Sequence, residues 1–170
     1  ESAPGPVFNY SSGTSMLLSK VLEQATGTTP DDYAKAKLWD PIQVSKVAHW
    51  SDAEGHTLTY CCVDTTSRDF ARFGLLYLHE GRWGTEQVVP DSWVADSLEG
   101  SRAAPDIYGL QWWLEHVDGV PDDLFQAEGH DDQYIYVIPS LDLVVVRNGS
   151  YTKYDGPTVA DPNLFSRYPS

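Results

Sequence analysis

The sequence is poor in positive charge. Its 170 residues hold 11 Lys and Arg against 25 Asp and Glu, a formal net charge of −14. A surface this acidic repels phosphate backbones and anionic lipid head groups, so we expect neither nucleic acid nor membrane partners. No apolar run approaches the roughly 20 residues that a membrane span needs. The opening ESAPGPVFNY lacks the charged start and apolar stretch of a signal peptide, so none is expected, and no cellular location is indicated.

Cysteine is scarce as well, and the two cysteines, Cys61 and Cys62, are adjacent. Neighbouring cysteines rarely pair with each other, because the geometry strains the peptide between them. We therefore expect two buried thiols in a strand. The five histidines are scattered singly, without a His-Glu-x-x-His pair or a Cys spacing typical of a metal site. We expect no metal and no cofactor.

A complete nucleophile motif is also missing. There is no Gly-x-Ser-x-Gly, which excludes the nucleophile elbow of many esterases. Ser-x-x-Lys, which places an amine one helical turn from a hydroxyl, occurs once, as SYTK at 150–153. A glycine precedes this match and Gly-Pro follows it, so a helix is not expected there. The alternative that Ser150 and Lys153 form a catalytic pair within this chain is kept open.

Apolar residues, by contrast, are plentiful: hydrophobic residues make up 41% of the chain and aromatics 12%, enough for a packed core. Periodicity and capping residues predict helices over 14–26, from Thr29 to about Leu38, over 67–79 and over 91–98. Strands are predicted over 58–63, 108–114, 125–127, 134–138 and 143–147. Helices followed by consecutive strands indicate an α+β domain, an antiparallel sheet with packed helices. The segment after Gly149 has no clear period and reads as an extended tail over 151–170.

Two short segments carry groups suited to catalysis. Tyr10 and Ser12 precede a helix, where a phenol can relay a proton if nearby cations lower its pKa. The alternative is that Tyr10 packs and Ser12 caps the helix. Gly129 and His130 lie between two β runs, where a backbone N–H at a strand edge can help to form an oxyanion hole. The alternative there is a polar hairpin turn.

Several segments together carry a family resemblance. They are FNYSSGTSMLLSKVLEQATG, LWDPI, DTTSRDFARFGLLYLHEGRW, YGLQWW and EGHDDQYIYVIPSLDLVVVRNG. In this order and spacing, over residues 4–150, they resemble the C-terminal half of the serine β-lactamase-like hydrolases. The most similar branch holds class C β-lactamases, related esterases and 6-aminohexanoate-dimer hydrolases. The resemblance implies a β-lactamase/transpeptidase-like fold, with residues 1–150 as its C-terminal portion and 151–170 as the tail.

The resemblance also implies roles for single residues. The family's Tyr-x-Asn or Tyr-x-Ser motif falls on Tyr10 and Ser12, with Tyr10 as general acid/base. Its strand that ends in glycine falls on Gly129, so the N–H of His130 would donate to the oxyanion. Members of this branch tend to read Gly-His-Asp-Gly-Gln at that place, whereas this chain has Asp132 in place of the fourth residue.

Aromatic residues complete the expected site. Tyr108 and Trp113, with Trp112, are expected to line the acyl or amine pocket, with core packing the role of at least one Trp. An acidic rim that includes Asp131 and Asp132 suits a cationic or amine-bearing substrate.

The family's first motif, Ser-x-x-Lys on a helix, lies upstream of the tyrosine motif and has no counterpart here. The expected partner is therefore an N-terminal half of the same protein that supplies Ser and Lys. The whole would be a serine hydrolase that cleaves a small-molecule ester or amide through an acyl-enzyme, and this chain alone would be inactive. The alternative is a non-catalytic fragment or binding module that uses a groove around Trp112 and His130. A half-sheet with open edges would be prone to aggregation unless a partner covers it.

Overall fold

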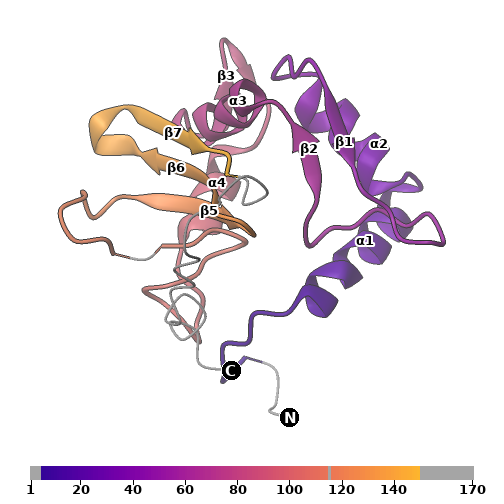
Figure 1. The fold of residues 1–170 in the computed structure, drawn as a ribbon, viewed down its shortest axis with the longest axis horizontal. Helices are drawn as coiled ribbons and strands as arrows, with labels where there is room; N and C mark the ends of the chain where they lie inside the picture. The colour runs from indigo at the N-terminus through magenta and orange to yellow at the C-terminus, as the bar shows by residue number, and fades with distance from the viewer. Residues whose placement is uncertain (1–4, 115, 150–170) are drawn as a thin grey trace, which may run out of the picture.

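The computed structural model describes residues 5–114 and 116–149, with helices and small hairpins first and a three-stranded sheet last (Figure 1). The helices are α1 (Ser12–Thr26), α2 (Pro30–Ala34), α3 (Ser67–Leu78) and α4 (Asp91–Leu98), with a π-helical turn η1 (Lys35–Trp39) after α2 and a 3-10 turn η2 (Pro139–Leu141). The strands are β1 (Val47–His49), β2 (Val63–Thr65), β3 (Arg82–Trp83), β4 (Glu86–Gln87), β5 (Phe125–Gly129), β6 (Gln133–Ile138) and β7 (Leu143–Arg147). Within these two ranges, no helix is long and apolar enough to cross a membrane.

The four predicted helices are confirmed, with the second continuing from α2 into the π-helical turn η1. Local caps fix several of their ends. Gly27 adopts the left-handed conformation (φ 72°) and donates its N–H to the carbonyl of Glu23 at 2.8 Å, which ends α1. The Thr29 side chain accepts the N–H of Asp32 at 3.1 Å and begins α2, as its sequence context predicts.

The main sheet is an antiparallel meander of β5, β6 and β7. Gly129 pairs with Gln133 at its first turn and Ile138 with Leu143 at its second. The α+β fold with an antiparallel sheet and packed helices, predicted from the sequence, is confirmed. The strand β7 lies at the edge of this sheet in the described part of the chain.

Helix α3 lies between this sheet and the β1–β2 hairpin (Figure 1). Gly74 lets β7 approach closely, since a Cβ at this position would lie 2.6 Å from Cγ1 of Val144. Phe73 contacts both of the large core clusters, one built around Trp112 and the other around Leu76. The aromatic ring of Phe73 therefore joins the two halves of the described structure.

The predicted strand over 108–114 is wrong. The segment turns back on itself: the N–H of Gly109 donates to the carbonyl of Trp112 at 2.9 Å, and Gln111 has a positive φ of 67°. Trp112 enters the cluster beneath the sheet, while Trp113 joins Tyr108 in a separate one. In a continuous strand Tyr108 and Trp113, five residues apart, would lie far apart and on opposite faces, whereas here they bridge to each other with ring centroids 4.7 Å apart.

The predictions for the cysteine segment are also wrong. Cys61 and Cys62 are joined to each other by a disulfide, and neither is a free thiol. The expected strand over 58–63 is replaced by β2, which begins only at Val63. The physical reason is Cys62, whose positive φ of 74° turns the backbone away from an extended conformation.

The predicted tail over 151–170 and the pair Ser150 and Lys153 lie outside the described residues. The domain limits drawn from the sequence stay predictions.

Candidate functional site

Tyr10 is placed by the start of α1. The helix is capped by Ser11, whose side chain accepts the N–H of Thr14 at 3.3 Å, and not by Ser12. Ser12 is the first helical residue and is exposed. The cap fixes the direction in which the chain enters the helix and so holds Tyr10 immediately before it.

The ring of Tyr10 is held by two aromatic residues that are distant in sequence. It stacks on Trp113 with ring centroids 5.4 Å apart and 28° between the planes, and it meets Tyr108 edge-on at 5.8 Å. Tyr108 and Trp113 contact each other at 4.7 Å. The structure thus brings together three of the residues that the sequence placed in the site, and Tyr10 stays 54% exposed, so that its phenol is accessible.

Strand β5 links this aromatic group to the other half of the expected site. The backbone of Trp113 pairs with Gln126 in both directions, with two N–H···O distances of 2.9 Å. Gln126 belongs to β5, which continues through Glu128 to Gly129 and the following turn. Tyr10 and the turn with His130 are therefore joined through one strand.

Glu128 is a site residue that sequence reasoning missed. Burial and the Glu128 carboxylate both raise the pKa of Tyr10. The phenol of Tyr134, opposite Glu128 on β6, donates to Oε1 of Glu128 at 3.2 Å. Alternation along β5 was the available signal: Ala127 packs in the core, so Glu128 lies on the other face.

The surroundings of Tyr10 shift its pKa in the direction opposite to the one that proton relay requires. A lowered pKa would favour proton relay, whereas both causes found here act in the opposite direction. Burial is the main cause that raises the pKa of Tyr108 to about 12, and the electrostatic effect of Tyr10 is the second cause. Tyr108 is therefore a neutral packing partner at ordinary pH, while Tyr10 remains the accessible phenol.

The turn between β5 and β6 has an unusual backbone. Asp131 and Asp132 both have positive φ, 63° and 55°. The expected glycine at position 132 is explained by this conformation, which glycine adopts freely and Asp adopts at a cost. The His130 side chain is exposed, and its Nδ1 lies 2.7 Å from Oδ1 of Asp131.

Side chains outside the turn hold it in place. The amide of Gln133 donates to the carbonyl of Gly149 at 2.6 Å and accepts the N–H of Gly149 at 3.1 Å, as a neighbouring strand would. Arg147 donates to the carbonyl of Asp132 and lies 3.5 Å from its carboxylate. Gln133 and Arg147 are therefore positioning residues for the segment that carries Gly129 and His130.

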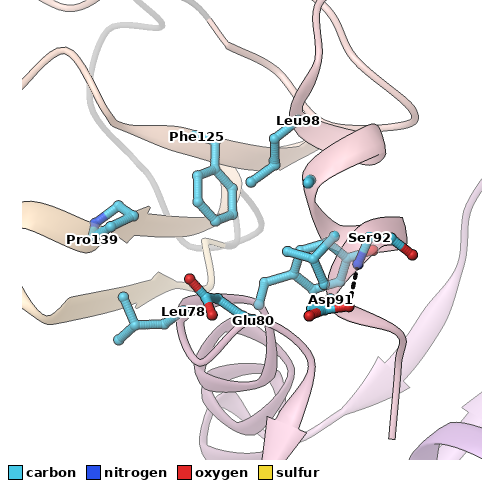
Figure 2. A pocket seen from close by; sticks show the side chains of 10 residues that line it. Leu78, Glu80, Asp91, Ser92, Leu98, Phe125 and Pro139 are labelled. Carbon is cyan, nitrogen blue, oxygen red and sulfur yellow. Dashed lines mark hydrogen bonds between the residues drawn. The ribbon is translucent and has the colours of Figure 1, made fainter. Parts of the chain in front are cut away.

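An apolar hollow of about 510 Å³ lies elsewhere, between the end of α3, α4 and β5 (Figure 2). Leu78, Leu98 and Phe125 are among its lining residues, and none of the predicted site residues lines it. The polar contact drawn there, from the N–H of Ser92 to Asp91 at 2.7 Å, is local to the first turn of α4. The hollow is thus separate from the candidate site.

Asp52, Glu54 and His56 place ligand-type atoms within 4.8 Å of one another. Asp52 already accepts the N–H groups of Glu54 at 3.0 Å and His56 at 2.8 Å. The backbone hydrogen bond from His56 is the main cause that lowers the pKa of the Asp52 carboxyl. The cluster is accounted for by the turn that it closes.

Comparison with known proteins agrees with the fold. The family model described as Beta-lactamase matches residues 1–162. A structure described as a 6-aminohexanoate-dimer hydrolase from Bacillus anthracis is 24% identical with a TM-score of 0.80, and the match covers 98% of this chain and 44% of that one. A β-lactamase from Mycobacterium bovis is 18% identical, with a TM-score of 0.70 and coverage of 97% and 66%.

A penicillin-binding protein from Bacillus halodurans is 16% identical with a TM-score of 0.68, and the match covers 97% of this chain and 58% of that one. The chain thus spans about half to two thirds of the length of these three structures. No curated protein matches the sequence.

Proposed function

Because the chain belongs to the β-lactamase family, we propose that it is the C-terminal part of a serine hydrolase that cleaves an ester or amide bond through an acyl-enzyme. The β-lactamase-family fold supports a serine-hydrolase type of function. The observation that carries the finer proposal is the half-exposed phenol of Tyr10, held against Trp113 beside the strand that leads to His130.

In the proposed reaction, a serine on an N-terminal portion attacks the carbonyl carbon of the substrate. Tyr10 and a lysine one helical turn from the serine together move the serine proton to the leaving group. The backbone N–H of His130 and that of the serine stabilise the negative charge that develops on the carbonyl oxygen. Tyr108 and Trp113 hold the Tyr10 ring and line the substrate pocket.

Two exposed apolar surfaces support an N-terminal portion as the partner. Leu17, Leu18 and Val21 on α1 are 51–66% exposed, and Val145 on the edge strand β7 is 43% exposed. An apolar helix stripe and an open sheet edge both favour association with further polypeptide. A lysine ammonium brought near Tyr10 by that polypeptide would lower the phenol pKa, against the effects of burial and Glu128.

Labelling with a fluorescent fluorophosphonate, followed by a denaturing gel, tests the proposal. We expect the label on the polypeptide that carries the N-terminal portion when it is present with this chain, and none on this chain alone. Tyr10→Phe, which keeps the ring on Trp113, is expected to lower ester or amide turnover by about a hundredfold or more. Undiminished turnover in Tyr10→Phe would contradict the role of Tyr10, and absence of label from the whole assembly would contradict the hydrolase.

A non-catalytic binding module is the second candidate, and Asp132 favours it. Its carboxylate stands where the family resemblance leads us to expect a glycine, in the turn beside the proposed oxyanion donor. Binding of an ester or amide that is unaffected by Tyr10→Phe, with no turnover and no label, would support this function over the first.

A further inference from the structure

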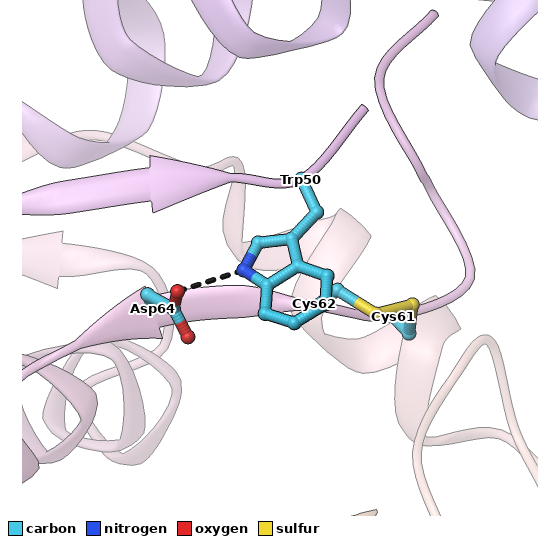
Figure 3. Close-up of a disulfide and its surroundings, with 4 residues drawn as sticks. All are labelled: Trp50, Cys61, Cys62 and Asp64. Atoms are coloured by element: carbon cyan, nitrogen blue, oxygen red, sulfur yellow. Dashed lines mark hydrogen bonds between the residues drawn. A yellow bond between two sulfur atoms is a disulfide. The ribbon is translucent and has the colours of Figure 1, made fainter. Parts of the chain in front are cut away.

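The disulfide between Cys61 and Cys62 lies in an accessible place. It precedes β2, and Figure 3 shows it together with Trp50 at the end of β1 and Asp64 in β2. Both cysteines are partly exposed. Neither residue is fully buried, and access from solvent is a condition for thiol–disulfide exchange.

Closure of this ring holds the backbone in a conformation that would otherwise be rare. Cys62 has a φ of 74°, in the left-handed region that residues with a Cβ seldom adopt. The covalent bond to the neighbouring residue restricts the dihedral angles of both cysteines. Opening of the ring removes that restriction and lets Cys62 return to an extended conformation.

The β1–β2 hairpin depends on the backbone at Cys62. Its carbonyl accepts the N–H of Trp50 at 3.0 Å, and the carbonyl of Trp50 in turn accepts the N–H of Leu58 at 2.8 Å. The indole N–H of Trp50 also donates to Asp64 at 2.7 Å (Figure 3). A rotation of the backbone at Cys62 breaks the first of these bonds and loosens the loop between Trp50 and Cys62.

The same loop is attached to α1. Thr59, two residues before Cys61, donates its hydroxyl to the carbonyl of Ser15 at 2.8 Å in a partly buried contact. Ser15 lies in the first turn of α1, directly after the segment that carries Tyr10. A change in the loop therefore reaches the helix start.

We propose that Cys61 and Cys62 form a reversible redox modification site, whose reduction by a dithiol loosens the contact between the loop and α1. One thiolate of the dithiol attacks a cysteine sulfur and forms a mixed disulfide, and its second thiolate displaces the protein thiol. The protein gains two thiols, and the dithiol leaves as a cyclic disulfide. An effect on Tyr10 rests in addition on the proposed function.

Alkylation of the folded protein tests the bond itself. The protein is purified without added thiol, and iodoacetamide is applied before and after dithiothreitol, with masses measured under non-reducing conditions. We expect no alkylation before reduction and alkylation of both cysteines after it. Alkylation of both without reduction, or a disulfide between two chains, overturns the proposal.

Hydrogen exchange tests the connection to α1. In the native protein, reduction is expected to speed amide exchange in peptides over 12–19 and 57–62 by about fivefold or more, the factor for the loss of one hydrogen bond. Replacement of Cys61 and Cys62 by two serines should give fast exchange with or without reductant. Cys61→Ser with Cys62→Gly is the matched control, since glycine adopts positive φ without the ring, and should exchange slowly in both conditions.

Exchange in α1 that does not respond to reduction overturns the connection to the helix. A control with Cys62→Gly that exchanges as fast as the two-serine variant overturns the backbone origin of the effect. Neither measurement uses a substrate. The proposed redox site and the proposed hydrolase function can therefore be disproved independently of each other.

Discussion

The ring of Tyr10 lies stacked on the indole of Trp113, with centroids 5.4 Å apart. Tyr10 comes before the first helix, whereas Trp113 is tied to β5 by two backbone hydrogen bonds. The pair therefore fixes the position of the candidate acid/base relative to the strand that leads to the candidate oxyanion donor.

Replacement of Trp113 by leucine removes this stacking. We expect the turnover of the complete enzyme to fall about tenfold, because the Tyr10 ring loses the partner that holds it in place. We also expect a loss of about 3 kcal/mol of unfolding free energy, because the smaller side chain leaves a cavity. Steady-state kinetics and chemical denaturation measure the two effects. Trp113→Phe, which keeps a stacking ring, should recover most of the turnover, and equal turnover in the Leu and Phe variants would contradict the positioning role.

Glu128→Gln tests the electrostatic control of Tyr10. The carboxylate raises the pKa of the phenol, so its removal should lower that pKa. Spectrophotometric titration of phenolate measures the shift, with Tyr10→Phe subtracted in the same background, either unsubstituted or Glu128→Gln, because Glu128 also raises the pKa of Tyr134 and Tyr136. In the complete enzyme, any activity that requires the phenolate should then appear at lower pH. Glu86→Gln, on the exposed strand β4, serves as the control and should leave both curves in place.

Substitutions at Asp132 separate backbone strain from charge. We expect unfolding free energies in the order Gly above Asp above Ala, with Gly about 0.5 kcal/mol above Asp, since only glycine adopts a φ of 55° without cost. Chemical denaturation gives the order, and an Ala variant as stable as the Gly variant would be inconsistent with it.

The charge of Asp132 is tested by Asp132→Asn, which keeps a side chain that tolerates the turn. If an acidic rim selects cationic substrates, this variant should lose several-fold of the preference for cationic over neutral esters. A preference of the unsubstituted enzyme for anionic esters would rule out that selection.

Gln133→Ala tests the attachment of the turn. The change leaves both backbone groups of Gly149 without their side-chain partner, so we expect a loss of about 1–2 kcal/mol and faster hydrogen exchange over 129–133. On the proposed function, kcat of the complete protein should fall more than KM changes, because the proposed oxyanion donor is displaced. Gln24→Ala, an exposed substitution on α1, is the matched control. Unchanged exchange over 129–133 would show that the turn is held by other contacts.

Asp69 gives the chain an acid-sensitive anchor at the start of α3. Burial raises the pKa of this carboxyl, but hydrogen bonds from Thr66, Ser45 and Arg72 outweigh it and hold the pKa below its usual value of 3.8. Its contribution to stability is therefore present above about pH 4 and is lost as the pH falls through the lowered pKa.

Asp69→Asn should lower the unfolding free energy at neutral pH by about 3 kcal/mol and flatten its decline in acid. Denaturation curves from neutral to acidic pH measure both effects. Asp96→Asn, exposed on α4, should do neither. An unchanged acid dependence in Asp69→Asn would locate the acid sensitivity elsewhere.

The helices were predictable because their signals are local. Gly27, Thr29 and the polar residues before Ser67 act within one helical turn, so the sequence contains the information that ends and begins each helix. The meander was predictable for a similar reason, since alternation and turn residues set β5, β6 and β7.

The errors arose where distant contacts decide the local conformation. Tyr108 and Trp113 pack together in one cluster, which bends a segment whose composition is typical of a strand. Glu128 lies near Tyr10 only because β5 carries it there, and nothing in its immediate sequence indicates a phenol partner. Cys62 adopts positive φ together with a covalent bond that adjacent cysteines seldom form.

The attachment of the turn through Gln133 and Arg147 has a consequence for divergence among related enzymes. The side chains that restrain the turn lie in β6 and β7, whereas the proposed oxyanion donor and the acidic residues beside it lie in the turn. Side chains at 130–132 can therefore differ between relatives while the contacts from Gln133 and Arg147, which use backbone groups, keep the turn on the sheet. Substrate preference in such a scaffold can evolve by exchange of three residues, with a stability cost at 131 and 132, where the backbone has positive φ.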